Sequence, residues 1–169
     1  MTISLYSASV PVFKQMLNAT ASILNKAEAH ATAKKIDASV LLQSRLYPDM
    51  FPLLQQVQIA ADFARGVSAR LAGVDVPVVD GSQTSFADLQ ILIATSLAFL
   101  DTLEPAQIDG QENRDIILRP GTPKERKFSG QAYLLNYALP QFFFHTTTTY
   151  AILRHNGLEV GKRDYMGTY

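Results

Sequence analysis

The fold is decided by the stretch Pro140-Gln-Phe-Phe-Phe-His-Thr-Thr-Thr-Thr-Tyr-Ala-Ile-Leu-Arg-His-Asn-Gly157. Its closing Asn-Gly pair is typical of a helix end, and the residues before it predict one long amphipathic helix. On that helix one stripe carries four residues spaced three or four positions apart: Phe142, His145, Thr149 and Ile152. An ordinary core helix has an apolar stripe, whereas this stripe has an imidazole and a hydroxyl at its centre. The middle of this helix is therefore the first place to look for a functional site.

The composition limits the class of protein. A chain of 169 residues is most simply one domain, which we expect to span residues 1–169. Its 15 Lys and Arg balance 15 Asp and Glu, so it lacks the basic surface that a nucleic-acid partner would require. Cysteine is absent, which excludes disulfides and thiol nucleophiles. We find no membrane-spanning stretch and no signal-peptide pattern, and we therefore expect a cytoplasmic protein without membrane contact.

Helical spacing of apolar residues predicts two long helices in the first half of the chain. The first begins near Ser7–Ser9 and ends near Lys34. The second begins near Met50–Pro52 and ends before Gly73. A short helix from Ala38 to about Leu46 is expected between them.

A third long helix follows a connector, Val74–Gln83. Ser85 and Asp88 are spaced like a capping box at its start, and Pro105 is expected to end it. After it, residues 104–128 are the least helical part of the chain and suggest a small β-hairpin or an extended excursion around a turn rich in Pro and Gly.

The fourth helix is expected to be capped by Ser129 and to kink or restart at Pro140. The predicted fold is thus an all-α four-helix bundle, with one short extra helix and a small hairpin between the third and fourth helices. Long connections before the second and fourth helices imply that the helices need not alternate in direction.

Candidate functional residues lie on two of these helices. A polar row at the border of the second helix's buried face contains Gln55, Gln58, Asp62 and Arg65, and an Arg65 or Lys partner would explain Asp62. His145 and Thr149 lie on the fourth helix. His145 is read either as a metal ligand or general base, or as a core histidine satisfied by a carbonyl and a threonine. Likewise, the threonine run 146–149 either bonds back to its own helix or lines a polar cavity.

A metal site in a bundle normally uses two ligands at i and i+4 on one helix. Here the position four residues after His145 is Thr149, which is a poor ligand. We therefore predict no resident cofactor. A divalent metal, if one binds, would use His145 with Gln58 or Asp62.

Four motifs together carry a family resemblance. They are Arg45-Leu-x-Pro-Asp-Met-Phe-Pro-Leu53, Phe128-x-Gly130, Phe144-His145-x-Thr-Thr-x-Tyr150-Ala-Ile-Leu-Arg-His155-x-Gly157 and Gly161-Lys162. Over nearly the whole chain they resemble an uncharacterised subfamily of the DinB-like bundles. The resemblance implies a DinB-type four-helix bundle with a long crossover, usually a homodimer.

The wider superfamily is similar to metal-dependent enzymes, including thiol S-transferases. Its pattern is one His on the second helix and an H-x-x-x-H pair on the fourth. By this resemblance His145 matches the first His of the pair, Thr149 stands in place of the second, and the second helix of this chain has no His.

Three functions remain open at this point. The leading hypothesis is a small-molecule binding protein, or a degenerate relative of the metalloenzymes, whose pocket is lined by Gln58, Asp62, His145 and Thr149. The second is a metal-dependent hydrolase or thiol S-transferase, which would require a metal with at least three protein ligands. The third is a dimeric interaction module, which a closed and well-packed interior around His145 would favour.

Overall fold

Four long helices form the bundle: α1 (Val10–Lys34), α3 (Leu53–Ala72), α4 (Phe86–Asp101) and α7 (Leu139–His155). The computed structural model describes residues 3–169, so Met1 and Thr2, which the single-domain prediction includes, lie outside the described part. Buried apolar side chains from all four helices join in one core cluster. The predicted all-α four-helix bundle is confirmed.

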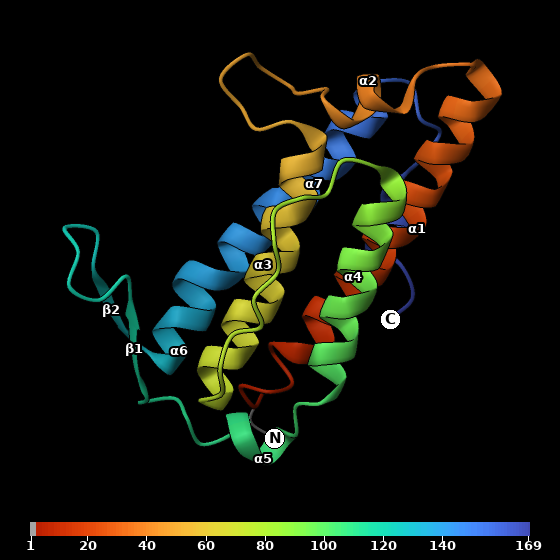
Figure 1. Cartoon of the computed structure of the whole chain (residues 1–169). Coiled ribbons are helices and arrows are strands. Elements are labelled where there is room, and N and C mark those ends of the chain that lie inside the picture. Colours follow the sequence, from red (N-terminus) through yellow and green to blue (C-terminus); the bar gives the residue numbers. More distant parts are fainter. Residues whose placement is uncertain (1–2) are drawn as a thin grey trace.

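Short elements connect or flank these helices (Figure 1). They are α2 (Ala38–Leu42), α5 (Pro105–Ile108), β1 (Asp115–Leu118), β2 (Arg126–Ser129), α6 (Gly130–Ala132), the π-helical segment η1 (Tyr133–Ala138) and α8 (Lys162–Met166). Within residues 3–169, no helix combines the length and the hydropathy that a bilayer-spanning segment needs.

The connector between α3 and α4 sets the topology. In Figure 1, α1 and α7 run upward while α3 and α4 both run downward, and the connector returns along α3 to the top of the bundle. A helix of 16 residues, such as α4, is about 24 Å long, which the extended connector can span. Two consecutive helices are therefore parallel. Non-alternating directions were expected from the connections before the second and fourth helices, whereas Val74–Gln83 is the segment responsible.

The start of α4 has the predicted capping box. The Ser85 hydroxyl accepts from the Asp88 N–H at 3.1 Å, and the Asp88 carboxylate accepts from the Ser85 N–H at 3.0 Å. The prediction for its end was wrong, because α4 ends at Asp101 and Pro105 begins α5. Proline suits a first helical turn, where its missing N–H would have no partner in any case.

The short helix also ends earlier than predicted, at Leu42 and not near Leu46. The Ser44 carbonyl accepts a hydrogen bond from the Leu53 N–H at 2.9 Å, so the chain has already left the helix there. This contact closes the proline-containing corner and sets where α3 begins.

The hairpin and the start of the fourth helix lie together on one side of the bundle (Figure 1). β1 pairs antiparallel with β2, with Leu118 opposite Arg126, which confirms the expected hairpin. The fourth helix is divided into α6, η1 and α7, and Pro140 lies in the first turn of α7. A proline and a π-helical segment are both recognised causes of a helix break. The backbone stays helical from α6 through Pro140 and changes from π- to α-helix at Leu139, and the π-helical segment was not anticipated.

Candidate functional site

His145 is buried between α3 and α7. All four residues of the predicted stripe are buried, and His145 has 7% of its surface exposed. Its Nδ1 lies 2.7 Å from Oε1 of Gln56, and the amide nitrogen of Gln56 donates to the Phe51 carbonyl at 3.0 Å. Because that amide orientation leaves Oε1 as an acceptor, Nδ1 of His145 carries the proton and Nε2 keeps its lone pair. Burial lowers the pKa of His145 below its usual value, so the ring is neutral at neutral pH.

The threonine run on α7 bonds to its own helix. The hydroxyls of Thr146, Thr148 and Thr149 each donate to a carbonyl one turn earlier, at 3.2, 2.7 and 2.9 Å. For Thr149 that acceptor is the carbonyl of His145. Of the two interpretations of this run, the structure supports the one in which the threonine hydroxyls hydrogen-bond to backbone carbonyls of their own helix.

The residues present do not fit the metal centre that the superfamily pattern implies. His145 offers a single lone pair, on Nε2, while Gln58 bonds to Gln83 and Asp62 pairs with Arg65. Across residues 3–169, no three His, Asp or Glu side chains come close enough together to hold an ion. No metal-dependent step can be built on these side chains as they stand.

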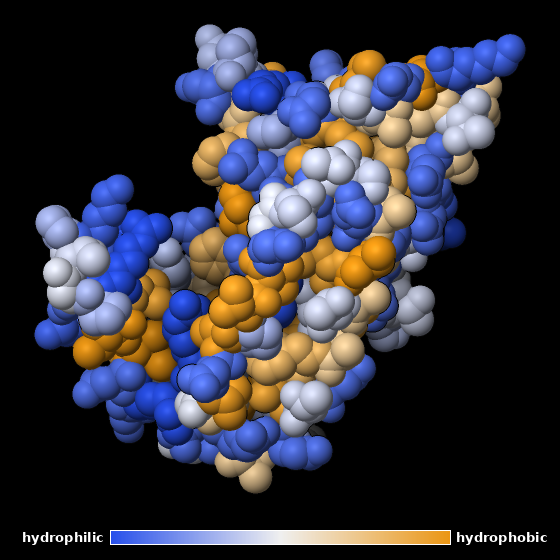
Figure 2. All heavy atoms as spheres, viewed as in Figure 1, coloured by the Kyte–Doolittle hydropathy of each residue, from blue (hydrophilic) through white to orange (hydrophobic). Residues whose placement is uncertain are grey.

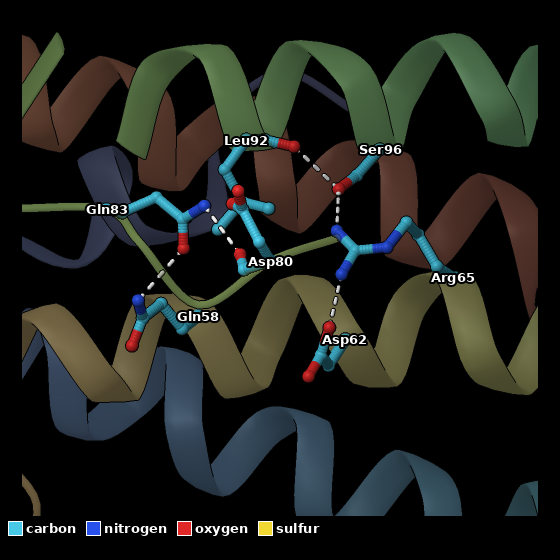
Figure 3. Close-up of polar contacts among 7 residues, drawn as sticks. All are labelled: Gln58, Asp62, Arg65, Asp80, Gln83, Leu92 and Ser96. Atoms are coloured by element: carbon cyan, nitrogen blue, oxygen red, sulfur yellow. Dashed lines mark hydrogen bonds and ion pairs between the residues drawn. The ribbon is translucent and has the colours of Figure 1, made fainter. Parts of the chain in front are cut away.

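Three of the five candidate residues do come together. Gln55, Gln58 and Asp62 line a cavity of about 180 Å³ with Arg65, Asp80 and Gln83, which we call the glutamine cavity. Figure 3 shows how the connector closes it. Gln58 donates to Gln83 at 2.9 Å, and Gln83 donates to the Asp80 carbonyl at 2.9 Å. The remaining two candidates, His145 and Thr149, make their hydrogen bonds elsewhere.

Arg65 is the most unusual lining residue of the glutamine cavity. It is only 2% exposed and crosses from α3 to α4, where Nη1 donates to the Ser96 hydroxyl at 2.5 Å (Figure 3). Nη2 pairs with Asp62, whose side chain is 71% exposed. Desolvation lowers the pKa of Arg65, and the Asp62 carboxylate opposes that effect. Nε finds no acceptor among residues 3–169, so the burial of this cation is incompletely compensated.

A larger groove adjoins the glutamine cavity along α3. It has a volume of about 540 Å³ and shares Asp62 and Val79 with the cavity. We call it the α3 groove and define it by six of its lining residues: Asp62, Phe63, Arg70, Val78, Tyr133 and Tyr137. Figure 2 shows a hollow between the hairpin side and the body of the molecule, on the face where these elements meet.

Aromatic side chains connect His145 to the α3 groove. The Phe63 ring stacks on His145 with centroids 6.0 Å apart, and it also lies against Tyr137 in a tilted arrangement at 6.0 Å. Tyr137 stacks in turn on Tyr133 at 5.9 Å. Arg70 donates to the Tyr133 hydroxyl at 3.4 Å, and burial raises the pKa of that hydroxyl. His145 therefore supports the groove wall through Phe63.

Sequence reasoning missed several of these residues. Gln56, the partner of His145, is one position away from Gln55 and lies on a different face of α3. Arg65 was placed in the polar row and named as a partner for Asp62, and that pair is confirmed, whereas its bond to Ser96 on α4 was not anticipated. Tyr133 and Tyr137 lie between Ser129 and Pro140, within the predicted fourth helix, and their i, i+4 spacing is the one signal that places them together.

Similarity to known proteins agrees with this fold. Residues 5–166 match the model of a family described as a domain of unknown function, DUF1993. A search of the curated proteins finds no match. A crystal structure of a DinB family member protein from Shewanella denitrificans is 41% identical, covers 98% of this chain and 93% of that chain, and superposes with a TM-score of 0.91.

Proposed function

The chain belongs to the DUF1993 family, a DinB-like family of unknown function, and we propose that it binds a small organic molecule in the α3 groove. The observation that carries this proposal is the groove itself. Its volume of about 540 Å³ lies within the range of small-molecule sites, and valine, phenylalanine and tyrosine side chains line it with a few polar groups.

The predicted site residues have different parts in this proposal. Gln55, Gln58 and Asp62 line the adjoining glutamine cavity and offer amide and carboxylate groups to a polar end of the ligand. His145 and Thr149 act from behind the groove wall, because His145 stacks on Phe63 and Thr149 bonds to the His145 carbonyl. We propose that these last two position the wall and do not touch the ligand.

A dimeric interaction module is the second candidate. The observation that favours it is the closed interior around His145, which is 7% exposed and hydrogen-bonded to Gln56. The two functions are compatible, since a groove on one face leaves other faces free to pair. We propose a cytoplasmic homodimer, in keeping with the neutral net charge and the 47% hydrophobic content of the chain.

Titration with N-phenyl-1-naphthylamine tests the groove. This neutral aromatic amine becomes fluorescent in apolar sites, and we expect saturable binding to one site per chain. Val78 lines the groove and is 97% exposed, so Val78→Asp should weaken binding about three- to tenfold without disturbing the core. The matched control is Val40→Asp on α2, another exposed valine that does not line the groove.

The two variants separate the outcomes. Unchanged binding in Val40→Asp alongside weaker binding in Val78→Asp would support the groove as the site. Equal binding in both variants, or no saturable binding to the wild-type protein, would count against the proposal.

A further inference from the structure

A second cavity extends the α3 groove toward the hairpin. It has a volume of about 510 Å³, and we call it the hairpin cavity. Leu118, Arg119 and Tyr137 line both spaces, so the two adjoin along these residues. The hairpin cavity is the more polar end, and the α3 groove with its valines is the more apolar end. A single elongated molecule can therefore contact both.

Positive charge gathers at the hairpin end. Arg119, Lys124 and Arg126 line the hairpin cavity, and Glu125 is the acidic residue among its lining side chains. Glu125 is already engaged, since it accepts from the Gly121 N–H at 2.7 Å and pairs with Lys127 at 3.4 Å. Within residues 3–169, none of the three lining cations forms an ion pair with a carboxylate. Their charge is left available to a ligand.

Two of these cations have features of their own at the junction. The Arg126 guanidinium lies over the Tyr137 ring, 5.7 Å from its centroid, which orients it at the shared wall. Arg119 adopts a left-handed backbone conformation with φ of +52° just before Pro120. That conformation is unfavourable for a non-glycine residue, and such strain is found preferentially where a side chain has a functional task.

We propose that the ligand is an elongated organic anion. Its apolar or aromatic body lies in the α3 groove against Tyr137 and Val78, and its anionic group lies in the hairpin cavity. There Arg119 and Arg126 bind the anionic group through charge-assisted hydrogen bonds. This inference rests on the proposed function and adds the chemical class of the ligand to it.

Two probes that differ by one anionic group test this class. 8-Anilino-1-naphthalenesulfonate is N-phenyl-1-naphthylamine with a sulfonate added, and the sulfonate is ionised across the usable pH range. We expect Arg126→Gln to weaken binding of the sulfonate probe about three- to tenfold and to leave the neutral probe within about twofold. Added salt should weaken only the sulfonate probe.

Arg154→Gln is the matched control. Arg154 lies in the last turn of α7, is exposed, forms no ion pair within residues 3–169 and lines neither cavity, so the same substitution there removes an equal charge away from the site. We expect it to change the binding of neither probe.

Arg119→Gly separates binding from stability. Glycine adopts the left-handed conformation freely, so the free energy of unfolding should hold or rise. Sulfonate binding should nevertheless weaken, because the cation is lost. A parallel loss of binding and stability would instead show that Arg119 acts only through the fold.

The outcomes distinguish the two proposals. If both probes bind and Arg126→Gln affects them equally or not at all, the anionic class is wrong and the groove remains a binding site. If neither probe binds saturably, the groove proposal fails and this inference fails with it. A selective loss of sulfonate binding in Arg126→Gln, absent in Arg154→Gln, is the result that supports it.

Discussion

Arg65 on α3 and His145 on the facing helix α7 are both buried polar side chains, and the protein accommodates them in different ways. His145 remains neutral, because burial lowers its pKa and Gln56 supplies an acceptor for its one N–H. Arg65 remains charged, because even a lowered pKa leaves an arginine protonated, and it reaches Asp62 and Ser96 for compensation. The His145–Gln56 hydrogen bond therefore links α3 to α7, and the Arg65–Ser96 hydrogen bond links α3 to α4.

The neutral state of His145 makes stability depend on pH. Its folded-state pKa lies below the unfolded value of about 6.5, so the unfolded chain binds the proton more readily. The contribution of His145 is therefore fully present above about pH 6.5 and is lost as pH falls toward the folded pKa. Proton–nitrogen NMR of the ring should report the Nδ1–H tautomer and a pKa below the usual value.

The Gln56→Glu variant should raise the pKa of His145, which burial lowers in the wild-type protein. A carboxylate beside Nδ1 would favour the imidazolium, so the pKa of His145 should rise relative to the wild-type protein. Gln58→Glu is the control, since Gln58 bonds to Gln83 and has no contact with the imidazole. An unchanged His145 pKa in Gln56→Glu would contradict the hydrogen bond assigned between these two residues.

At the scale of elements, the glycine after α7 can be compared with a glycine in the connector. Gly157 follows α7 with φ of +87°, and a Cβ at that position would meet no atom within 4 Å. Any loss of stability when Gly157 is replaced by alanine therefore comes from the backbone conformation and not from a steric clash. Gly81 in the connector likewise has open space around a Cβ, but its φ lies outside the left-handed region.

These two glycines make a matched prediction. Gly157→Ala should lower the free energy of unfolding by about 1 kcal/mol, because alanine resists the left-handed conformation. Gly81→Ala should leave it unchanged or raise it by about 0.4–1 kcal/mol, because it restricts the unfolded chain. Chemical denaturation of both variants measures the difference. Equal effects at the two sites would refute the backbone explanation.

The fourth helix shows how an irregular element positions a candidate site. The π-helical segment η1 carries both Tyr133 and Tyr137, and each lines the α3 groove. π-Helical segments occur frequently at functional sites, because they shift the faces that a helix presents. The chain then returns to regular α-helix at Leu139, so that His145 faces α3.

For the molecule as a whole, the parallel arrangement of α3 and α4 creates the candidate site. The returning connector covers one side of α3 and closes the glutamine cavity (Figure 3), and the hairpin borders the α3 groove from the other side. Both spaces therefore depend on segments that are distant in sequence and meet on a single helix.

The proposed homodimer is tested at this scale. Phe51 and Phe144 are exposed aromatic residues that each contact the buried Gln56–His145 pair, since Gln56 bonds to the Phe51 carbonyl and His145 packs edge-on against Phe144; we call these two residues the phenylalanine patch. We propose that the phenylalanine patch meets its own copy across a two-fold axis. Sedimentation should give a dimer mass for the wild-type protein and a monomer mass for the Phe51→Ser, Phe144→Ser double variant.

Val78→Ser provides the control for the dimer. Val78 is an exposed apolar residue of the α3 groove, away from the phenylalanine patch, so its replacement should leave the dimer mass unchanged. A wild-type protein that sediments as a monomer throughout the micromolar range would rule the dimer out.

Much of the architecture could be read from the sequence alone. The long helices, the capping box of Ser85 and Asp88, the hairpin and the buried stripe of α7 were all predicted. Each depends on residues within about four positions of one another, through caps, turn residues and helical period. Such local signals are present in the sequence whatever the rest of the chain does. The same reasoning misjudged Pro105, because proline both ends helices and begins them.

The tertiary structure decided which polar groups meet. Gln55, Gln58 and Asp62 share a row, yet the rotation of α3 against α7 brings Gln56 to His145 and turns the row toward the connector. A rotation of one residue, about 100° on a helix, exchanges these partners. Close packing between side chains far apart in sequence sets that rotation, and it also sets the distance between the hairpin and η1. The sequence by itself therefore determined the elements and their caps, while packing decided the partners of His145 and the shape of the α3 groove.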